Sequence, residues 1–122
     1  MKKSIKEESE NFIFGDQAKI DIVGDGIRRQ MLGFNGQLMM ARVWFDEGSI
    51  GYVHEHYHSQ VSYIESGEFD VSIDNVVKRM KAGDSFYIPP NIEHGAVCIK
   101  EGVLLDMFSP AREDFLETDA EK

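Results

Sequence analysis

Apolar and polar residues alternate along most of this chain, in short runs that end at turn residues. Glu68–Ile73 shows the pattern clearly: phenylalanine, valine and isoleucine fall on one face, aspartate and serine on the other. A period of two residues indicates a strand with one buried face. Asn35–Gly36 is the strongest hairpin signal between two such runs. The pattern predicts about nine strands, drawn from Ala18–Val23, Ile27–Phe34, Gln37–Phe45, Tyr52–His58, Gln60–Ser66, Glu68–Ile73, Asn75–Met80, Ser85–Pro90, His94–Ile99 and Val103–Phe108.

One segment, Ser109–Thr118, has a helical pattern, with Ser109 as a possible N-cap and Pro110 at the first helical position. Strands spaced by about 8–12 residues and one short terminal helix indicate an antiparallel sandwich or barrel. An all-β double-stranded jelly roll fits the number of strands best. We expect a single domain over residues 1–122, with a core over about residues 18–117 and flexible acidic ends.

Composition and charge exclude several classes of function. A net charge of −9 argues against a nucleic-acid partner, because phosphate binding needs clustered lysine and arginine. No apolar stretch reaches the length of a membrane span, and the N-terminus lacks the apolar segment of a signal peptide, so we expect a soluble, cytoplasmic protein. Cys98 is the sole cysteine and lies in an apolar run, which favours a small buried hydrophobe over a nucleophile.

Three of the four histidines stand at alternate positions, His54, His56 and His58, and Gln60 continues the alternation. On a regular strand all four side chains would face the same side. Imidazole is the commonest transition-metal donor in proteins. His94 follows a Pro-Pro-Asn turn that can direct it back toward the others. The pattern favours a metal site; an exposed histidine-rich patch, with an incidental His94, is the alternative.

Both histidine-bearing segments resemble motifs of the cupin family. The first motif, G-x5-H-x-H-x3,4-E-x6-G, is matched with a glutamine in the glutamate position, at His54, His56, Gln60 and Gly67. The second, G-x5-P-x-G-x2-H-x3-N, is matched at Gly83, Pro89, Asn91 and His94. Asn91 replaces the central glycine of that motif, a mild change because asparagine tolerates the left-handed conformation. Cys98 replaces the final asparagine, which is not usually a ligand.

The resemblance implies a cupin jelly roll and a divalent metal ion, held by His54, His56, Gln60 and His94. Imidazole nitrogens and an amide oxygen suit nickel, zinc, iron, manganese or cobalt, so the identity of the metal stays open. Four neutral donors would leave the ion its full charge and two open positions in an octahedral shell. His58 falls outside this set. It would contact the metal ligands without binding the ion, face a substrate, or be exposed.

A closer resemblance, to the KdgF-type cupins of pectin degradation, runs from about Ile27 to Leu116. It rests on RRQMLGFNGQLMMARVWFDEG, HEHYHSQ, IPPNIEHGA and above all LLDMFSPAREDFL. That group also has glutamine as a fourth ligand. The resemblance implies an isomerase-type enzyme that opens 4,5-unsaturated monouronates, from pectin or alginate, to the linear 5-keto-4-deoxyuronate. It therefore implies a small anionic sugar as substrate, and a homodimer is expected because dimers are common among small cupins.

The same resemblance places the catalytic residues in the C-terminal run. A lone acid in an apolar strand is costly to bury, so we expect Asp106 to be a general acid/base; a hydrogen-bonded structural acid is the alternative. Phe108 would pack on the sugar or belong to the core. Arg112 would pair with the substrate carboxylate or Asp106, or with a glutamate of the predicted helix. Three residues on one face of an earlier strand are weaker candidates for the cavity wall: Met40, Arg42 and Trp44.

Two other functions stay open at this point. A metal dioxygenase would share the fold, but many iron sites of that class include a carboxylate ligand, which Gln60 does not supply. A non-catalytic sugar-binding cupin would chelate a uronate without changing it. Ring opening removes an ultraviolet-absorbing double bond, so absorbance separates an enzyme from a binder.

Overall fold

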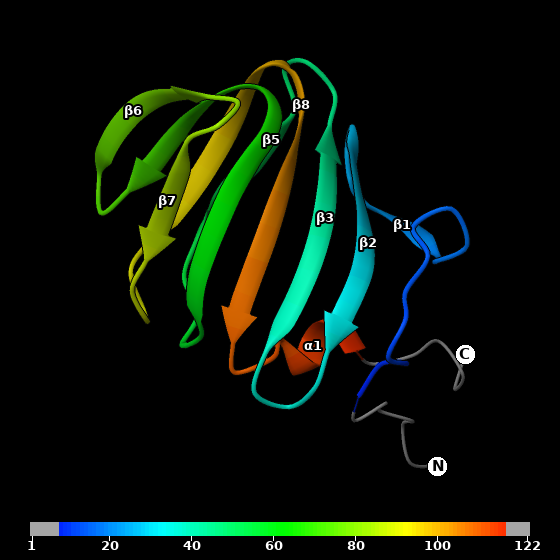
Figure 1. Cartoon of the computed structure of the whole chain (residues 1–122). Coiled ribbons are helices and arrows are strands. Elements are labelled where there is room, and N and C mark those ends of the chain that lie inside the picture. Colours follow the sequence, from blue (N-terminus) through cyan, green and yellow to red (C-terminus); the bar gives the residue numbers. More distant parts are fainter. Residues whose placement is uncertain (1–7, 117–122) are drawn as a thin grey trace.

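Antiparallel strands form most of the computed structural model, which describes residues 8–116 (Figure 1). The elements are β1 (Ile20–Gly24), β2 (Ile27–Phe34), β3 (Met39–Phe45), β4 (Ile50–His54), β5 (Ser59–Ile73), β6 (Val76–Lys81), β7 (Ser85–Ile88), β8 (His94–Ser109) and α1 (Glu113–Leu116). The expected flexible acidic ends fall for the most part on residues 1–7 and 117–122, outside the described residues. Across residues 8–116, no helix is long and apolar enough to cross a bilayer.

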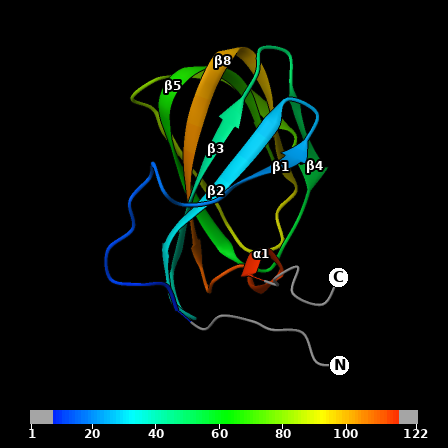
Figure 2. The same cartoon turned by 90° about the vertical axis from the view of Figure 1, so that its right-hand side faces the viewer.

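Two long strands, β5 and β8, run antiparallel along most of their lengths and divide the remaining strands into two sheets. The first half of β5 and the second half of β8 lie between β7 and β3, and β2 and β1 extend this sheet. The other halves of β5 and β8 lie between β6 and β4. Figure 2 shows the strands curving around an interior, with α1 at one end. This arrangement confirms the predicted all-β jelly roll.

The chain passes from one sheet to the other where Gly67 and Gly102 lie against each other. The register of the β5–β8 pair shifts around Gly67, whose φ is 86°. A Cβ atom on Gly67 would lie 2.5–2.6 Å from backbone atoms of Lys100, Glu101 and Gly102, and one on Gly102 would overlap the backbone of Ser66. Both strands bend at this point because the two glycines let their backbones approach closely.

We therefore expect Gly67→Ala to lower the free energy of unfolding by more than about 3 kcal/mol, measured by urea denaturation. Gly83→Ala is the matched control, because Gly83 also has a positive φ (95°) but open space around its Cβ position. Gly83→Ala should lower the free energy of unfolding only by the cost of a positive φ at a non-glycine residue, about 1–2 kcal/mol. Equal losses in the two variants would contradict the close approach as the cause.

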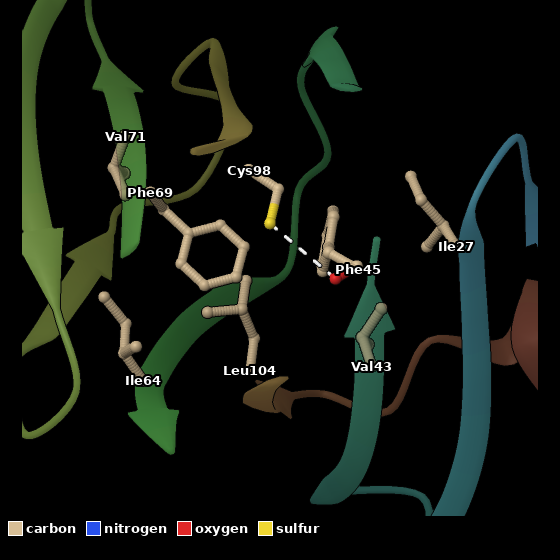
Figure 3. Close-up of a cluster of buried hydrophobic side chains, with 8 residues drawn as sticks. All are labelled: Ile27, Val43, Phe45, Ile64, Phe69, Val71, Cys98 and Leu104. Atoms are coloured by element: carbon tan, nitrogen blue, oxygen red, sulfur yellow. Dashed lines mark hydrogen bonds between the residues drawn. The ribbon is translucent and has the colours of Figure 1, made fainter. Parts of the chain in front are cut away.

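A hydrophobic cluster lies in the interior between the sheets (Figure 3). Its buried members are Ile27, Val43, Phe45, Ile64, Phe69, Val71, Cys98 and Leu104. Phe45 and Phe69 meet edge to face at a centroid distance of 5.3 Å. Cys98 is 1% exposed, its thiol lies 3.7 Å from the Phe45 carbonyl oxygen, and burial raises its pKa to about 11. The prediction that Cys98 is a buried hydrophobe is therefore confirmed.

Some predicted elements differ from the observed ones. The runs predicted as separate strands on either side of Gly67 form one strand, β5, and β8 likewise spans two predicted runs, because the bulges interrupt the alternation without ending the pairing. The predicted helix is shorter and begins at Glu113. Ser109 is the last residue of β8 and Pro110 precedes the helix, so their assignments as N-cap and first helical residue are wrong, and Thr118 lies outside the described residues.

Candidate metal centre

Three imidazoles converge where β4 ends and β8 begins. His54 is the last residue of β4 and lies directly opposite His94, the first residue of β8. His56 lies in the connection between β4 and β5. One ring nitrogen from each residue falls within 4.8 Å of the others, so the three could hold a metal ion. The predicted strand Tyr52–His58 is wrong, because β4 ends at His54; cross-strand pairing and a loop, rather than alternation, bring the histidines together.

The backbone orients all three rings in the same way. The Nδ1 atoms of His54, His56 and His94 lie 2.8, 3.0 and 2.9 Å from the carbonyl oxygens of residues 52, 58 and 92. A carbonyl oxygen only accepts, so each Nδ1 carries the hydrogen and donates it. Each Nε2 then has a free lone pair. This is the tautomer that a metal ion requires of a histidine bound through Nε2.

The turn before His94 ties the two histidine-bearing segments together. Asn91 has a φ of 62°, the left-handed conformation expected of a residue in the glycine position of the motif. Its N–H donates to the carbonyl oxygen of His56 at 2.7 Å. The carbonyl oxygen of Ile92 then accepts from the His94 ring. One unusual backbone conformation thus positions both His56 and His94.

Gln60, the second residue of β5, is buried beside this group. Its Nε2 donates to Ser62 Oγ at 2.9 Å, and the Ser62 hydroxyl donates to Asp106 Oδ1 at 2.6 Å. These bonds turn Gln60 Oε1 toward His56 Nε2, 3.0 Å away. Because His56 Nδ1 carries the ring hydrogen, two lone pairs face each other there, and a cation between them would satisfy both. Two ligands bound at right angles about 2.1 Å from one ion would be separated by about this distance.

Burial keeps these donors available to a cation. His94 Nε2 is buried and has no hydrogen-bond partner among the described residues. Burial lowers the pKa of His94 to about 4 and also lowers the pKa of His56, although the nearby Gln60 oxygen, which could accept a hydrogen bond from a protonated ring, opposes the latter shift. Both rings are neutral at pH 7, so their lone pairs are free to bind a metal. The residues present therefore fit a divalent transition metal.

A cavity of about 450 Å³ lies between the sheets next to the histidines. Its wall includes most of the predicted site residues: His54, Gln60, His94, Asp106, Phe108 and Arg112. Met40, Arg42 and Trp44 are not in the wall, so that prediction is wrong. The alternate residues of β3, from Met39 to Phe45, are the buried ones, and they take the face that looks inward.

Asp106 lies on β8 directly opposite Ser62 of β5. Burial raises the pKa of Asp106 to about 6, and the hydrogen bond from Ser62 opposes that shift, as do the more distant charges of Arg112 and Arg29. Among the described residues, Ser62 is its one side-chain hydrogen-bond partner. Asp106 is therefore a partly protonated acid at the cavity wall near neutral pH.

Phe108 and Arg112 lie at the end of the cavity next to α1. Phe108 is 3% exposed and packs with Met39 in a second small core cluster, with its ring 5.8 Å from the His56 ring. Arg112 forms two hydrogen bonds with Asp114, at 3.0 and 2.8 Å, and its guanidinium lies over the Phe108 ring. Among the described residues, Asp114, two residues along the chain, is thus the partner of Arg112, rather than Glu113; Glu117, the other glutamate of the predicted helix, lies outside the described residues.

His58 lies behind the cluster. It is 4% exposed, its ring stacks on Tyr57 at a centroid distance of 3.9 Å, and neither ring nitrogen has a hydrogen-bond partner within residues 8–116. It is absent from the cavity wall. The alternative that His58 is exposed is therefore wrong, and so is a direct contact with the cavity.

Comparison with known proteins agrees with this geometry. Residues 41–108 match the cupin domain family. The chain belongs to the cupin family. It is 39% identical over 107 residues to the pectin degradation protein KdgF of Dickeya dadantii, a match that covers 86% of this cupin and 97% of that protein.

Solved structures extend the comparison. An RmlC-like cupin from Shewanella frigidimarina is 57% identical, with a TM-score of 0.88 over 90% of this cupin and 99% of that chain. KdgF from Halomonas sp. is 33% identical, with a TM-score of 0.84 over 88% and 100% of the two chains. The KdgF-type resemblance noticed in the sequence is thus confirmed over most of the chain.

Sequence reasoning missed three residues of this cupin's site: Arg29, Ser62 and Phe115. Arg29 and Phe115 line the cavity, and Ser62 joins Gln60 to Asp106. Arg29 stands two residues after the buried Ile27 in β2, and Ser62 two residues after Gln60, so strand alternation could have found both. Nothing in the local sequence distinguishes Phe115 from a core residue.

We expect His94→Ala to lower the affinity for a divalent metal by at least about 100-fold, because it removes one of three converging donors. Metal content after dialysis and competition with a chelator measure this. His58→Phe is the matched control: it keeps an aromatic ring, and the His58 carbonyl that orients His56 is unchanged. Equal metal loss in the control would show that His58 is itself a ligand.

The pH dependence of stability should reveal two opposed buried groups in the metal-free protein. The pKa of His94 falls from 6.5 to about 4 on folding, so the unfolded chain binds more protons and acidification through this window destabilises the fold. The pKa of Asp106 rises from 3.8 to about 6, so acidification from pH 6 to 4 stabilises the fold. Each effect is at most about 3 kcal/mol.

Urea denaturation of metal-free variants between pH 7 and pH 4 separates these contributions. Asp106→Asn should lose more stability on acidification than the wild type, because the opposing carboxyl is gone. His94→Asn should lose less than the wild type. Parallel pH profiles in all three proteins would contradict the assignment of these shifts.

Proposed function

We propose that this cupin is a metal-dependent, isomerase-type enzyme that opens 4,5-unsaturated monouronates to the linear 5-keto-4-deoxyuronate. The observation that carries the proposal is the chain His56, Gln60, Ser62 and Asp106, which joins a neutral metal-donor set to a protonatable acid at one cavity wall. The likeness to the pectin degradation protein KdgF of Dickeya dadantii supports uronates as the substrates.

The reaction moves one proton and changes no oxidation state overall. The hydroxyl on C1 loses its proton, the bond from C1 to the ring oxygen breaks, and C1 becomes an aldehyde. The electrons of that bond leave an enolate over the ring oxygen, C5 and C4. Protonation at C4 then gives the ketone at C5. The chain must supply a group that accepts a proton from oxygen and returns one to carbon.

Asp106 suits this proton transfer. A pKa of about 6 lets the carboxylate accept a proton near neutral pH and release it again. Oδ1 is held by the Ser62 hydroxyl, which sets the orientation of the carboxyl group. We assign the general acid/base role to Asp106.

We assign the metal to His54, His56, His94 and Gln60. When bound, a divalent ion would supply a Lewis acid that stabilises negative charge on a substrate oxygen. The four donors are neutral and would not reduce the charge of the ion toward an anionic sugar. Phe108 is positioned to pack on the sugar from the cavity end, and Arg112 adds positive charge beside it.

Absorbance of the 4,5 double bond tests the function. Metal-loaded protein should bleach unsaturated galacturonate and unsaturated alginate monomers well above the uncatalysed rate. Asp106→Asn should lower kcat by about 100- to 10,000-fold while metal content is unchanged. Asp70→Asn is the control. It makes the same chemical change, from a carboxylate to an amide, at a residue that is paired with Arg79 on the surface.

Several results would contradict the proposal. Binding of the uronate without bleaching by the wild type would favour a sugar-binding cupin. Oxygen consumption in place of bleaching would favour a dioxygenase. Loss of metal in Asp106→Asn would show that Asp106 supports the metal rather than the proton transfer.

A further inference from the structure

Arg29 is a cation in the cavity wall that the proposed proton transfer does not use. It lies on β2 directly opposite Val43, a buried core residue, so its side chain starts on the inward face of the sheet. It lines the same cavity as Asp106 and Arg112. Its guanidinium carbon lies 3.6 Å from the centroid of the Phe115 ring. The ring supports one face of the guanidinium and leaves its edges free to donate hydrogen bonds.

Within the described part of the chain this guanidinium has no directly bonded counter-charge, although the carboxylates of Asp114, Asp21 and Asp106 favour its charged form from a greater distance. Among residues 8–116, no carboxylate forms an ion pair or hydrogen bond with Arg29. Asp21, its cross-strand neighbour on β1, lies 3.1 Å from the ammonium of Lys19 instead. Burial and then the charge of Arg112 disfavour the charged form of Arg29, and their effect exceeds that of the three carboxylates, so the pKa of Arg29 is lowered. A partly buried cation without a partner is costly, and an anionic ligand would offset that cost.

Arg112 differs from Arg29 in this respect. Two of its nitrogens already bond Asp114, and its side chain is 13% exposed. Its guanidinium lies 4.2 Å from the centroid of the same Phe115 ring. The two arginines therefore share one aromatic support at one end of the cavity, and Arg29 is the one whose side-chain donors have no hydrogen-bond partner among residues 8–116.

We propose that Arg29 binds the carboxylate of the uronate substrate and makes the site selective for uronates over neutral sugars. This inference rests on the proposed function of the same site. A guanidinium presents two parallel donors that match the two oxygens of a carboxylate. The carboxylate is attached to C5, next to the ring oxygen and C4, so holding it also positions the bonds that change.

The kinetic consequence differs from that of Asp106. The carboxylate keeps its charge through the reaction, so Arg29 contacts it equally in the ground state and the transition state. Interactions of that kind lower KM and leave kcat unchanged. Arg29 is thus a positioning and specificity residue, and Asp106 acts on kcat.

Arg29→Gln tests the proposal in metal-loaded protein, with binding of saturated galacturonate measured by calorimetry beside turnover of the unsaturated sugar. Saturated galacturonate lacks the reacting double bond, so its binding reports recognition alone. We expect Kd and KM to rise about 10- to 100-fold, kcat to change less than about threefold, and metal content to stay constant. The weaker binding of galactose, which lacks the carboxylate, should not change.

Arg28→Gln is the matched control. Arg28 is the preceding residue of the same strand, is exposed, and lies opposite Trp44, a residue outside the cavity wall. The Arg28→Gln substitution removes the same charge and should leave Kd and KM unchanged. Arg29→Lys keeps the charge but not the paired donors, and should raise Kd and KM by an intermediate factor. This variant decides the question if Arg29→Gln does not fold.

The outcomes distinguish this inference from the proposed function. Galacturonate binding that depends on Arg29, without turnover by the wild type, supports the inference and contradicts the proposed reaction. Turnover with unchanged Kd and KM in Arg29→Gln supports the reaction and overturns the role of Arg29. Absence of both galacturonate binding and turnover in the wild type overturns both.

Discussion

The pairing of β5 with β8 is the constraint on which the rest of this structure depends. The first half of β5 places Gln60 opposite Phe108 and Ser62 opposite Asp106, and beyond the register shifts around Gly67 the second half places Ile73 opposite His94. The glycines at the bend let the two strands cross together from one sheet to the other. The acid, the amide and the last histidine of the site are therefore all positioned by one antiparallel ladder. A shift of one residue would turn each of these side chains to the opposite face.

The site contains two kinds of polar group, metal-donor imidazoles and a carboxyl group, and burial affects their pKa values in opposite directions. Burial lowers the pKa of His56 and His94, and backbone carbonyls orient all three rings so that their Nε2 lone pairs converge. The same burial shifts the pKa of the Asp106 carboxyl the other way, up to about 6. Low polarity disfavours charge in both cases, yet it leaves a set of electron-pair donors beside a proton carrier. This combination is what a metal-assisted proton transfer needs.

Much of the fold was predictable, because strand alternation is a local property. The alternation in β3 and in the second half of β5 identified the strands, and the buried Cys98 followed from its apolar surroundings. The site was only partly predictable. The identities of His54, His56, Gln60 and His94 came from a motif, but the reason given for their convergence was wrong, because β4 ends before His56. Arg29 was missed because a charged residue in a strand looks like a solvent-facing one.

By itself, the sequence determined an antiparallel jelly roll, the donor types near a metal, and the family to which the chain belongs. These follow from residue chemistry and from spacings of a few positions. The tertiary structure decided which face of β3 looks inward, that Arg112 pairs with Asp114, that His58 is buried behind the cluster, and that Arg29 shares the cavity with Asp106. Most of these depend on contacts between residues far apart in the chain. Such distances are set by strand register and sheet closure, which no local pattern of residues encodes.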